Sequence, residues 1–139
     1  MSAQQSTFDK RWQYAAAALS ALAGFIHILV APDHFEEWIG YGVFFVMASA
    51  CQWLFALIVL AYTPPQRELL WTGLLGNAAI IALWAVTRTL GLPFFGPEAG
   101  EVEPVGLVDS VSKLVEVALM TCLALMLRGQ SSPGAHADR

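Results

Sequence analysis

The segment VGLVDSVSKLVEVALMTCLALML, residues 105–127, decides the fold because it is long and apolar enough to cross a lipid bilayer. A helix of about 20 residues spans the ~30 Å hydrocarbon core. Four polar residues, spaced at i, i+3, i+4 and i+7, lie on one face of that helix: Asp109, Ser112, Lys113 and Glu116. A charge facing lipid at the centre of a span costs roughly 2.5–3.5 kcal/mol. This face must therefore point into a bundle of helices.

Three further apolar segments, 14–31, 40–62 and 69–90, also have lengths suited to membrane-spanning helices. Helices are required because lipid offers no hydrogen-bond partner to an unsatisfied backbone group. We therefore expect an all-α integral membrane protein, with residues 1–128 forming a single four-helix transmembrane bundle. The tail, 129–139, is rich in small and polar residues, and we expect it to be disordered.

The composition agrees with a lipid environment. The chain has 139 residues, of which 57% are hydrophobic and 13% charged, whereas soluble domains contain about 25% charged residues. The net charge is −4, and the seven Lys and Arg residues form no basic run. The sequence thus indicates the lipid bilayer as partner and gives no sign of a nucleic-acid partner.

The basic residues predict the orientation of the helices. Arg88 borders one side of the membrane, and the other flanking cations lie on the opposite side: Lys10, Arg11, Arg67 and Arg128. Because cytoplasmic loops carry the excess of Lys and Arg, we expect both termini, the tail included, to be cytoplasmic. The membrane would be the cytoplasmic (plasma) membrane.

The sequence APDHFEEW, residues 31–38, predicts a break after the first helix. Pro32 follows the apolar segment directly, and polar side chains alternate here with aromatic ones. We expect the first helix to end at this proline and a short interfacial segment, anchored by Trp38, to lie on the membrane surface.

The other helices also carry polar residues at helical spacing. Asn77, Trp84 and Arg88 share one face of the third helix, and Gln52 supplies a polar group on the second. Arg88 would balance the excess negative charge of Asp109 and Glu116. We therefore predict a polar, ionisable pocket in the extracytoplasmic half of the bundle, lined by Asp109, Lys113, Glu116, Arg88, Asn77, Gln52 and Trp84.

A divalent metal ion is a possible cofactor. His34 and Glu37 are three residues apart, so one helical turn would let both ligate the same ion, and His27 lies on the same outer side. Nitrogen and oxygen ligands of this kind suit zinc, iron or manganese. The H-x-x-E pattern is short and recurs by chance, so it carries little weight alone.

Three functional hypotheses follow. The pocket could bind a cation, a proton or a small polar ligand, in a transport-accessory or ligand-binding role. The same residues could serve an intramembrane metal-dependent or acid–base enzyme. Alternatively, the polar face could pair with another copy or another membrane protein in a structural or assembly subunit. The sequence contains no phosphate-binding glycine loop, no G-x-S-x-G and no H-E-x-x-H.

Overall fold

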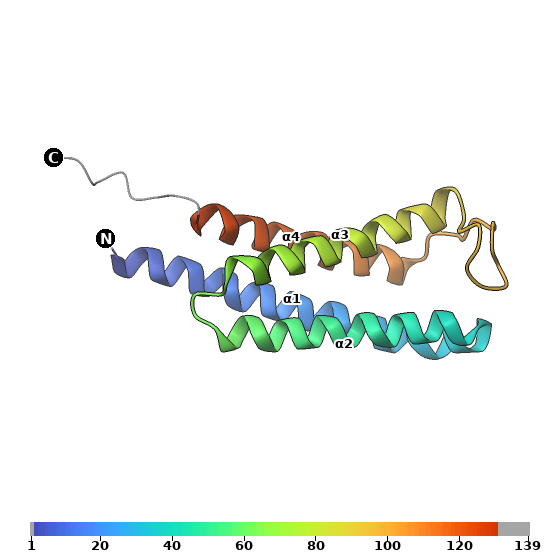
Figure 1. Ribbon diagram of the computed structural model, residues 1–139, viewed down its shortest axis with the longest axis horizontal. Coiled ribbons are helices and arrows are strands. Elements are labelled where there is room, and N and C mark those ends of the chain that lie inside the picture. Colours follow the sequence, from blue (N-terminus) through green and yellow to red (C-terminus); the bar gives the residue numbers. More distant parts are fainter. Residues whose placement is uncertain (1, 131–139) are drawn as a thin grey trace.

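The computed structural model describes residues 2–130, with side chains from Lys10 onward. It consists of four helices and, within the described residues, no strand (Figure 1): α1 (Ser2–Glu37), α2 (Ile39–Ala61), α3 (Arg67–Thr89) and α4 (Leu107–Gln130). The predicted all-α fold is confirmed. Residues 129 and 130 of the predicted disordered tail belong to α4, and the rest of the tail lies outside the described residues.

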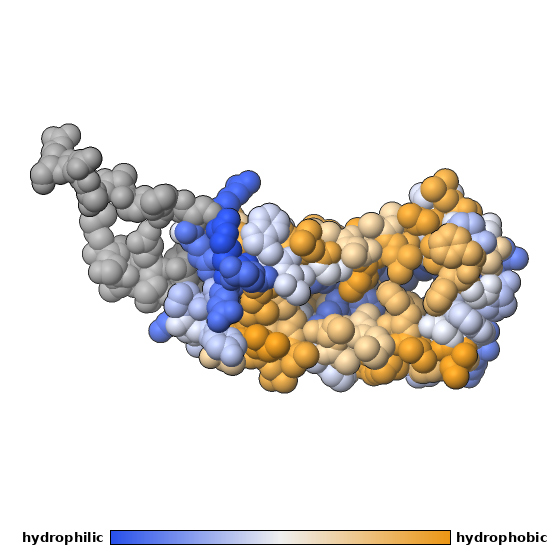
Figure 2. All heavy atoms as spheres, viewed as in Figure 1, coloured by the Kyte–Doolittle hydropathy of each residue, from blue (hydrophilic) through white to orange (hydrophobic). Residues whose placement is uncertain are grey.

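Each helix contains a stretch long and apolar enough to span a membrane. Large apolar side chains cover the outside of the molecule, where Leu29, Leu57, Leu75 and Leu114 are each at least 60% exposed. The space-filling view shows this apolar surface along the length of the bundle (Figure 2). Because water would disfavour so large an apolar surface, the four helices point to a membrane protein.

The helices form two hairpins that diverge along their length. Helix α1 packs against α2 and α4, and α3 packs against α4. Figure 1 shows α2 and α3 separating toward the loop that connects α3 to α4. The apolar core lies nearer the other end, and its fully buried members include Ala16, Val59, Leu70, Leu119 and Leu123.

Two glycines allow the helices to approach closely. A Cβ atom on Gly73 of α3 would lie 2.3 Å from the Phe55 ring of α2. One on Gly24 of α1 would lie 2.7 Å from the Trp53 side chain of α2. Neither distance is compatible with a side chain unless the neighbouring ring moves. The Gly73 contact joins α3 to α2 on the core side of the point where the two helices separate.

The structure corrects the predicted end of the first helix. Helix α1 continues through Pro32 to Glu37, and only Trp38 adopts an extended conformation before α2 begins. The predicted short interfacial segment is therefore the last turn of α1. A proline removes one backbone donor but does not always end a helix. The apolar segment ends at residue 31, but the helix continues for six more residues through a polar sequence.

The predicted start of the fourth helix is also wrong. The fourth apolar segment was expected to be helical from residue 105, but α4 begins at Leu107. The Asp109 carboxylate accepts a hydrogen bond from the Gly106 backbone N–H at 3.1 Å. This contact resembles half of a capping box, in which a side chain of the first turn bonds back to the residue before the helix.

The Gly73 contact predicts a stability difference between two glycines of α3. Gly73→Ala should lower the free energy of unfolding by about 1–3 kcal/mol, because the added methyl group overlaps the Phe55 ring. Gly76→Ala is the matched control, since its Cβ would have no neighbour within 4 Å. Unfolding by sodium dodecyl sulfate in mixed micelles would measure both. Equal stability of the two variants would contradict the packing described.

Candidate functional site

A cavity of about 340 Å³ lies where the two hairpins diverge, and all four helices and the α3–α4 loop line it. This volume is within the range of small-ligand sites in proteins. Figure 2 shows a hydrophilic patch deep between the apolar side chains of the two hairpins. Most of the wall is apolar or aromatic and includes Ile26, Phe44, Phe45, Ile80, Leu83 and Val108.

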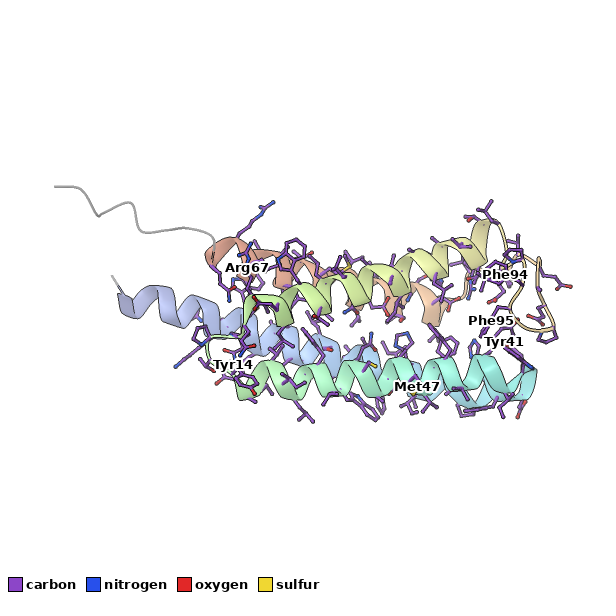
Figure 3. All side chains as sticks on the ribbon, in the orientation of Figure 1. Tyr14, Tyr41, Met47, Arg67, Phe94 and Phe95 are labelled. Atoms are coloured by element: carbon purple, nitrogen blue, oxygen red, sulfur yellow. The ribbon has the colours of Figure 1, made fainter. Side chains whose placement is uncertain are left out.

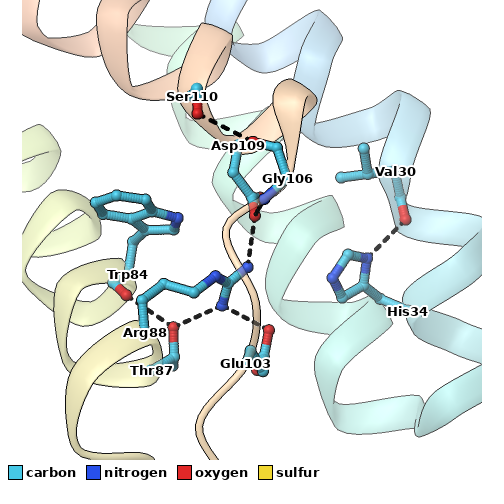
Figure 4. Close-up of polar contacts among 9 residues, drawn as sticks. All are labelled: Val30, His34, Trp84, Thr87, Arg88, Glu103, Gly106, Asp109 and Ser110. Carbon is cyan, nitrogen blue, oxygen red and sulfur yellow. Dashed lines mark hydrogen bonds and ion pairs between the residues drawn. The ribbon is translucent and has the colours of Figure 1, made fainter.

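Arg88 of α3 organises one wall of the cavity. Its guanidinium donates to Asp109 of α4 at 2.8 Å and to Glu103 of the loop at 2.5 Å (Figure 4). It also donates to the Thr87 hydroxyl at 2.8 Å. Two carboxylates thus share one guanidinium, whose planar fork suits this kind of pairing. Arg88 was expected to balance the excess negative charge of Asp109 and Glu116, and it pairs with Asp109 and with Glu103, whose role was not predicted.

Glu116 of α4 lies deeper, and its side chain is completely buried. One carboxylate oxygen lies 2.5 Å from the Lys113 Nζ, one turn away on the same helix. The other, Oε1, lies 3.4 Å from the His27 Nε2 of α1 and has no hydrogen-bond partner. Lys113, rather than Arg88, therefore balances the charge of Glu116.

A chain of hydrogen bonds continues from His27 across the remaining helices. The His27 Nδ1 lies 2.8 Å from the Gln52 Oε1 of α2, and the Gln52 amide donates to the Asn77 Oδ1 of α3 at 3.3 Å. Asn77 in turn donates to the Gly73 carbonyl at 2.8 Å. Of the residues predicted to line one pocket, Gln52, Asn77 and Glu116 thus belong to a buried network with His27 and do not line the cavity. The cavity is lined by the others, which are Arg88, Asp109, Lys113 and Trp84. The sequence had placed His27 with candidate metal ligands instead.

The predicted metal site is not formed. Within residues 10–130, no group of three or more His, Cys, Asp or Glu side chains is arranged to hold an ion. His34 bonds the Val30 carbonyl of its own helix at 2.8 Å and lies against the Phe45 ring, while Glu37 is exposed. His27 also contacts Phe45. The Phe45 ring therefore packs against both histidines, and the carboxylate of Glu37 does not join them.

Three buried polar atoms of the cavity residues have no partner in the part of the chain described. They are the Trp84 Nε1, the Arg88 Nε and the Ser112 Oγ. The first two are donors, and the hydroxyl can donate as well. Leaving such a group buried and unpaired costs about 1–3 kcal/mol.

The α3–α4 loop lines the end of the cavity that is farther from the apolar core. The Phe95 ring packs edge-on against Trp38 at 5.0 Å between ring centroids, and its carbonyl accepts a hydrogen bond from the Tyr41 hydroxyl at 3.0 Å. Figure 3 shows Phe94, Phe95 and Tyr41 gathered at this end. Gly96 has a φ of +83°, which favours glycine, and a Cβ there would lie 2.3 Å from the Tyr41 oxygen. The loop thus joins the second hairpin to the first.

Comparison with known proteins gives no relative from which to transfer a function. No protein-family model, no curated protein and no solved structure matches this chain. The function must therefore be argued from the site itself.

The Arg88 cluster predicts a specific pattern of coupling. Arg88→Gln should destabilise the protein by about 1–3 kcal/mol, because Asp109 and Glu103 lose a charged hydrogen-bond donor. In the double variant Arg88→Gln/Asp109→Asn the loss should be smaller than the sum of the two single losses. Detergent unfolding of the four proteins in this double-mutant cycle measures the coupling. Strictly additive losses would show that the pair contributes nothing.

Proposed function

We propose that this protein is an integral membrane binding protein whose cavity takes a small, neutral, amphipathic molecule with acceptor oxygens. The observation that carries the proposal is that three of the five buried, unpaired side-chain atoms in the described residues belong to residues lining one cavity, Trp84, Arg88 and Ser112. Buried donors are almost always paired, so each unpaired one requires an explanation, and a bound molecule is the explanation proposed for these three. The apolar wall would hold the body of the molecule.

The charges of the cavity argue against an ionic ligand. Asp109 and Glu103 are paired with Arg88, and Glu116 with Lys113, so the inner carboxylates already have cationic partners. An anion would meet an excess of acidic groups, since the cavity is lined by four carboxylic acids but only two Lys or Arg side chains: Glu98, Glu101, Glu103, Asp109, Arg88 and Lys113. A neutral acceptor such as a ketone avoids both costs.

We place the cavity at the extracytoplasmic side of the cytoplasmic membrane. This placement is supported by the distribution of cations, because Lys10, Arg11, Arg67 and Arg128 flank the end opposite to the cavity. Both termini would then be cytoplasmic. The ligand would reach the cavity from the outer aqueous side or from the outer leaflet of the bilayer.

Three probes with one apolar chain test the ligand class. We expect nonan-2-one to raise the midpoint of thermal unfolding of the detergent-purified protein, while nonanoate and nonylamine at equal concentration do not. A ligand at one hundred times its Kd stabilises by about 2.7 kcal/mol. A shift with nonylamine alone would instead indicate a cationic ligand that uses the acids of the mouth.

Variants distinguish binding in the cavity from a general effect of the probe on the detergent micelle. Trp84→Phe and Ser112→Ala each remove one donor and keep most of the side-chain volume, so each should reduce the shift caused by nonan-2-one. Trp71→Phe is the matched control, because Trp71 is 43% exposed and does not line the cavity. An equal shift in all four proteins would refute the proposed site.

A further inference from the structure

We infer that His27 and Glu116 hold one exchangeable proton between them at the inner end of the cavity. The two side chains are almost completely removed from solvent, with 4% and 0% exposure, and the His27 Nε2 lies 3.4 Å from the Glu116 Oε1. This site needs no ligand, so it goes beyond the binding function proposed above.

The hydrogen-bond chain fixes which ring nitrogen of His27 carries its permanent proton. The Gly73 carbonyl can only accept, so Asn77 must present its NH₂ group to it and its oxygen to Gln52. Gln52 then presents its own oxygen to His27. The His27 Nδ1 therefore donates, and a backbone carbonyl of α3 has determined the tautomer of a histidine on α1.

That tautomer leaves the His27 Nε2 as the position where a second proton binds. In the neutral ring this nitrogen carries a lone pair, and it faces a carboxylate oxygen that also carries lone pairs. Two acceptors facing each other in a buried site repel, and the 3.4 Å gap is too short for a water molecule between them. One proton, taken from the solvent, converts this repulsion into attraction.

The surroundings allow the proton to exchange. The charged groups that act on His27 are Glu116 and Lys113, both on α4. From α2 and α3 the neutral amides of Gln52 and Asn77 complete the network that surrounds it. His27 and Lys113 line the cavity whereas Glu116 does not. The proton would thus enter and leave through the cavity on the imidazole side of the pair.

Nuclear magnetic resonance of the full chain with isotope-labelled histidine and glutamate tests the inference. We expect the His27 Nδ1 to stay protonated across the pH range. The signals of the His27 Nε2 and the Glu116 carboxyl carbon should change together in a single one-proton transition. His34, which bonds a backbone carbonyl of its own helix, is the internal control for assigning the histidine signals.

Two variants assign the transition to the pair. Glu116→Gln should abolish the shared transition at His27, and Lys113→Gln/Glu116→Gln should do so without leaving a lysine charge buried alone. An Nε2-protonated tautomer would overturn the inference, and so would separate transitions at His27 and Glu116 or no transition at either. The result does not depend on any ligand, so a failure here leaves the nonan-2-one experiment intact.

Discussion

The buried carboxyl group of Glu116 constrains how the four helices are arranged. A carboxylate completely removed from water at the middle of an apolar span is unfavourable unless other groups of the protein compensate it. Lys113 supplies a charge from the same helix, but the second oxygen must be faced by another helix, and His27 of α1 occupies that position. Helix α4 therefore cannot rotate in the bundle without exposing a charge to lipid.

The side-chain amides of Gln52 and Asn77 connect this buried pair to the remaining two helices. The imidazole of His27 requires an acceptor, which Gln52 of α2 provides, and Gln52 requires one in turn from Asn77 of α3. Each of these bonds is individually worth only about 1 kcal/mol. Together they fix how the two hairpins are aligned along the bundle axis, because residues at the same depth must meet. Between this network and the α3–α4 loop, α2 and α3 separate, and the cavity occupies the space between them.

The sequence predicted the parts of this structure that depend on local pattern. The length of the apolar segments predicted the four helices. The free-energy cost of a charge in lipid predicted that the polar face of α4 points into the bundle. Charge balance indicated that Arg88 would offset the excess negative charge of Asp109 and Glu116, and in the structure it pairs with Asp109. Charge balance did not indicate the contact with Glu103, because a loop residue has no periodicity that would place it. His27 was assigned to a metal site because spacing along one helix cannot show that Gln52 and Glu116 lie opposite.

The polar groups of the bundle divide into two sets with different physical states. In the inner network every amide has a partner, so those groups are satisfied by the fold alone. Around the cavity the acidic groups take the terminal nitrogens of Arg88, while the indole of Trp84 and the hydroxyl of Ser112 stay unpaired. Groups that served only stability would be expected to pair in the same way on both levels. Three of the five buried, unpaired side-chain atoms of the described residues belong to side chains that line the cavity, which is why we attribute these three to binding rather than to folding.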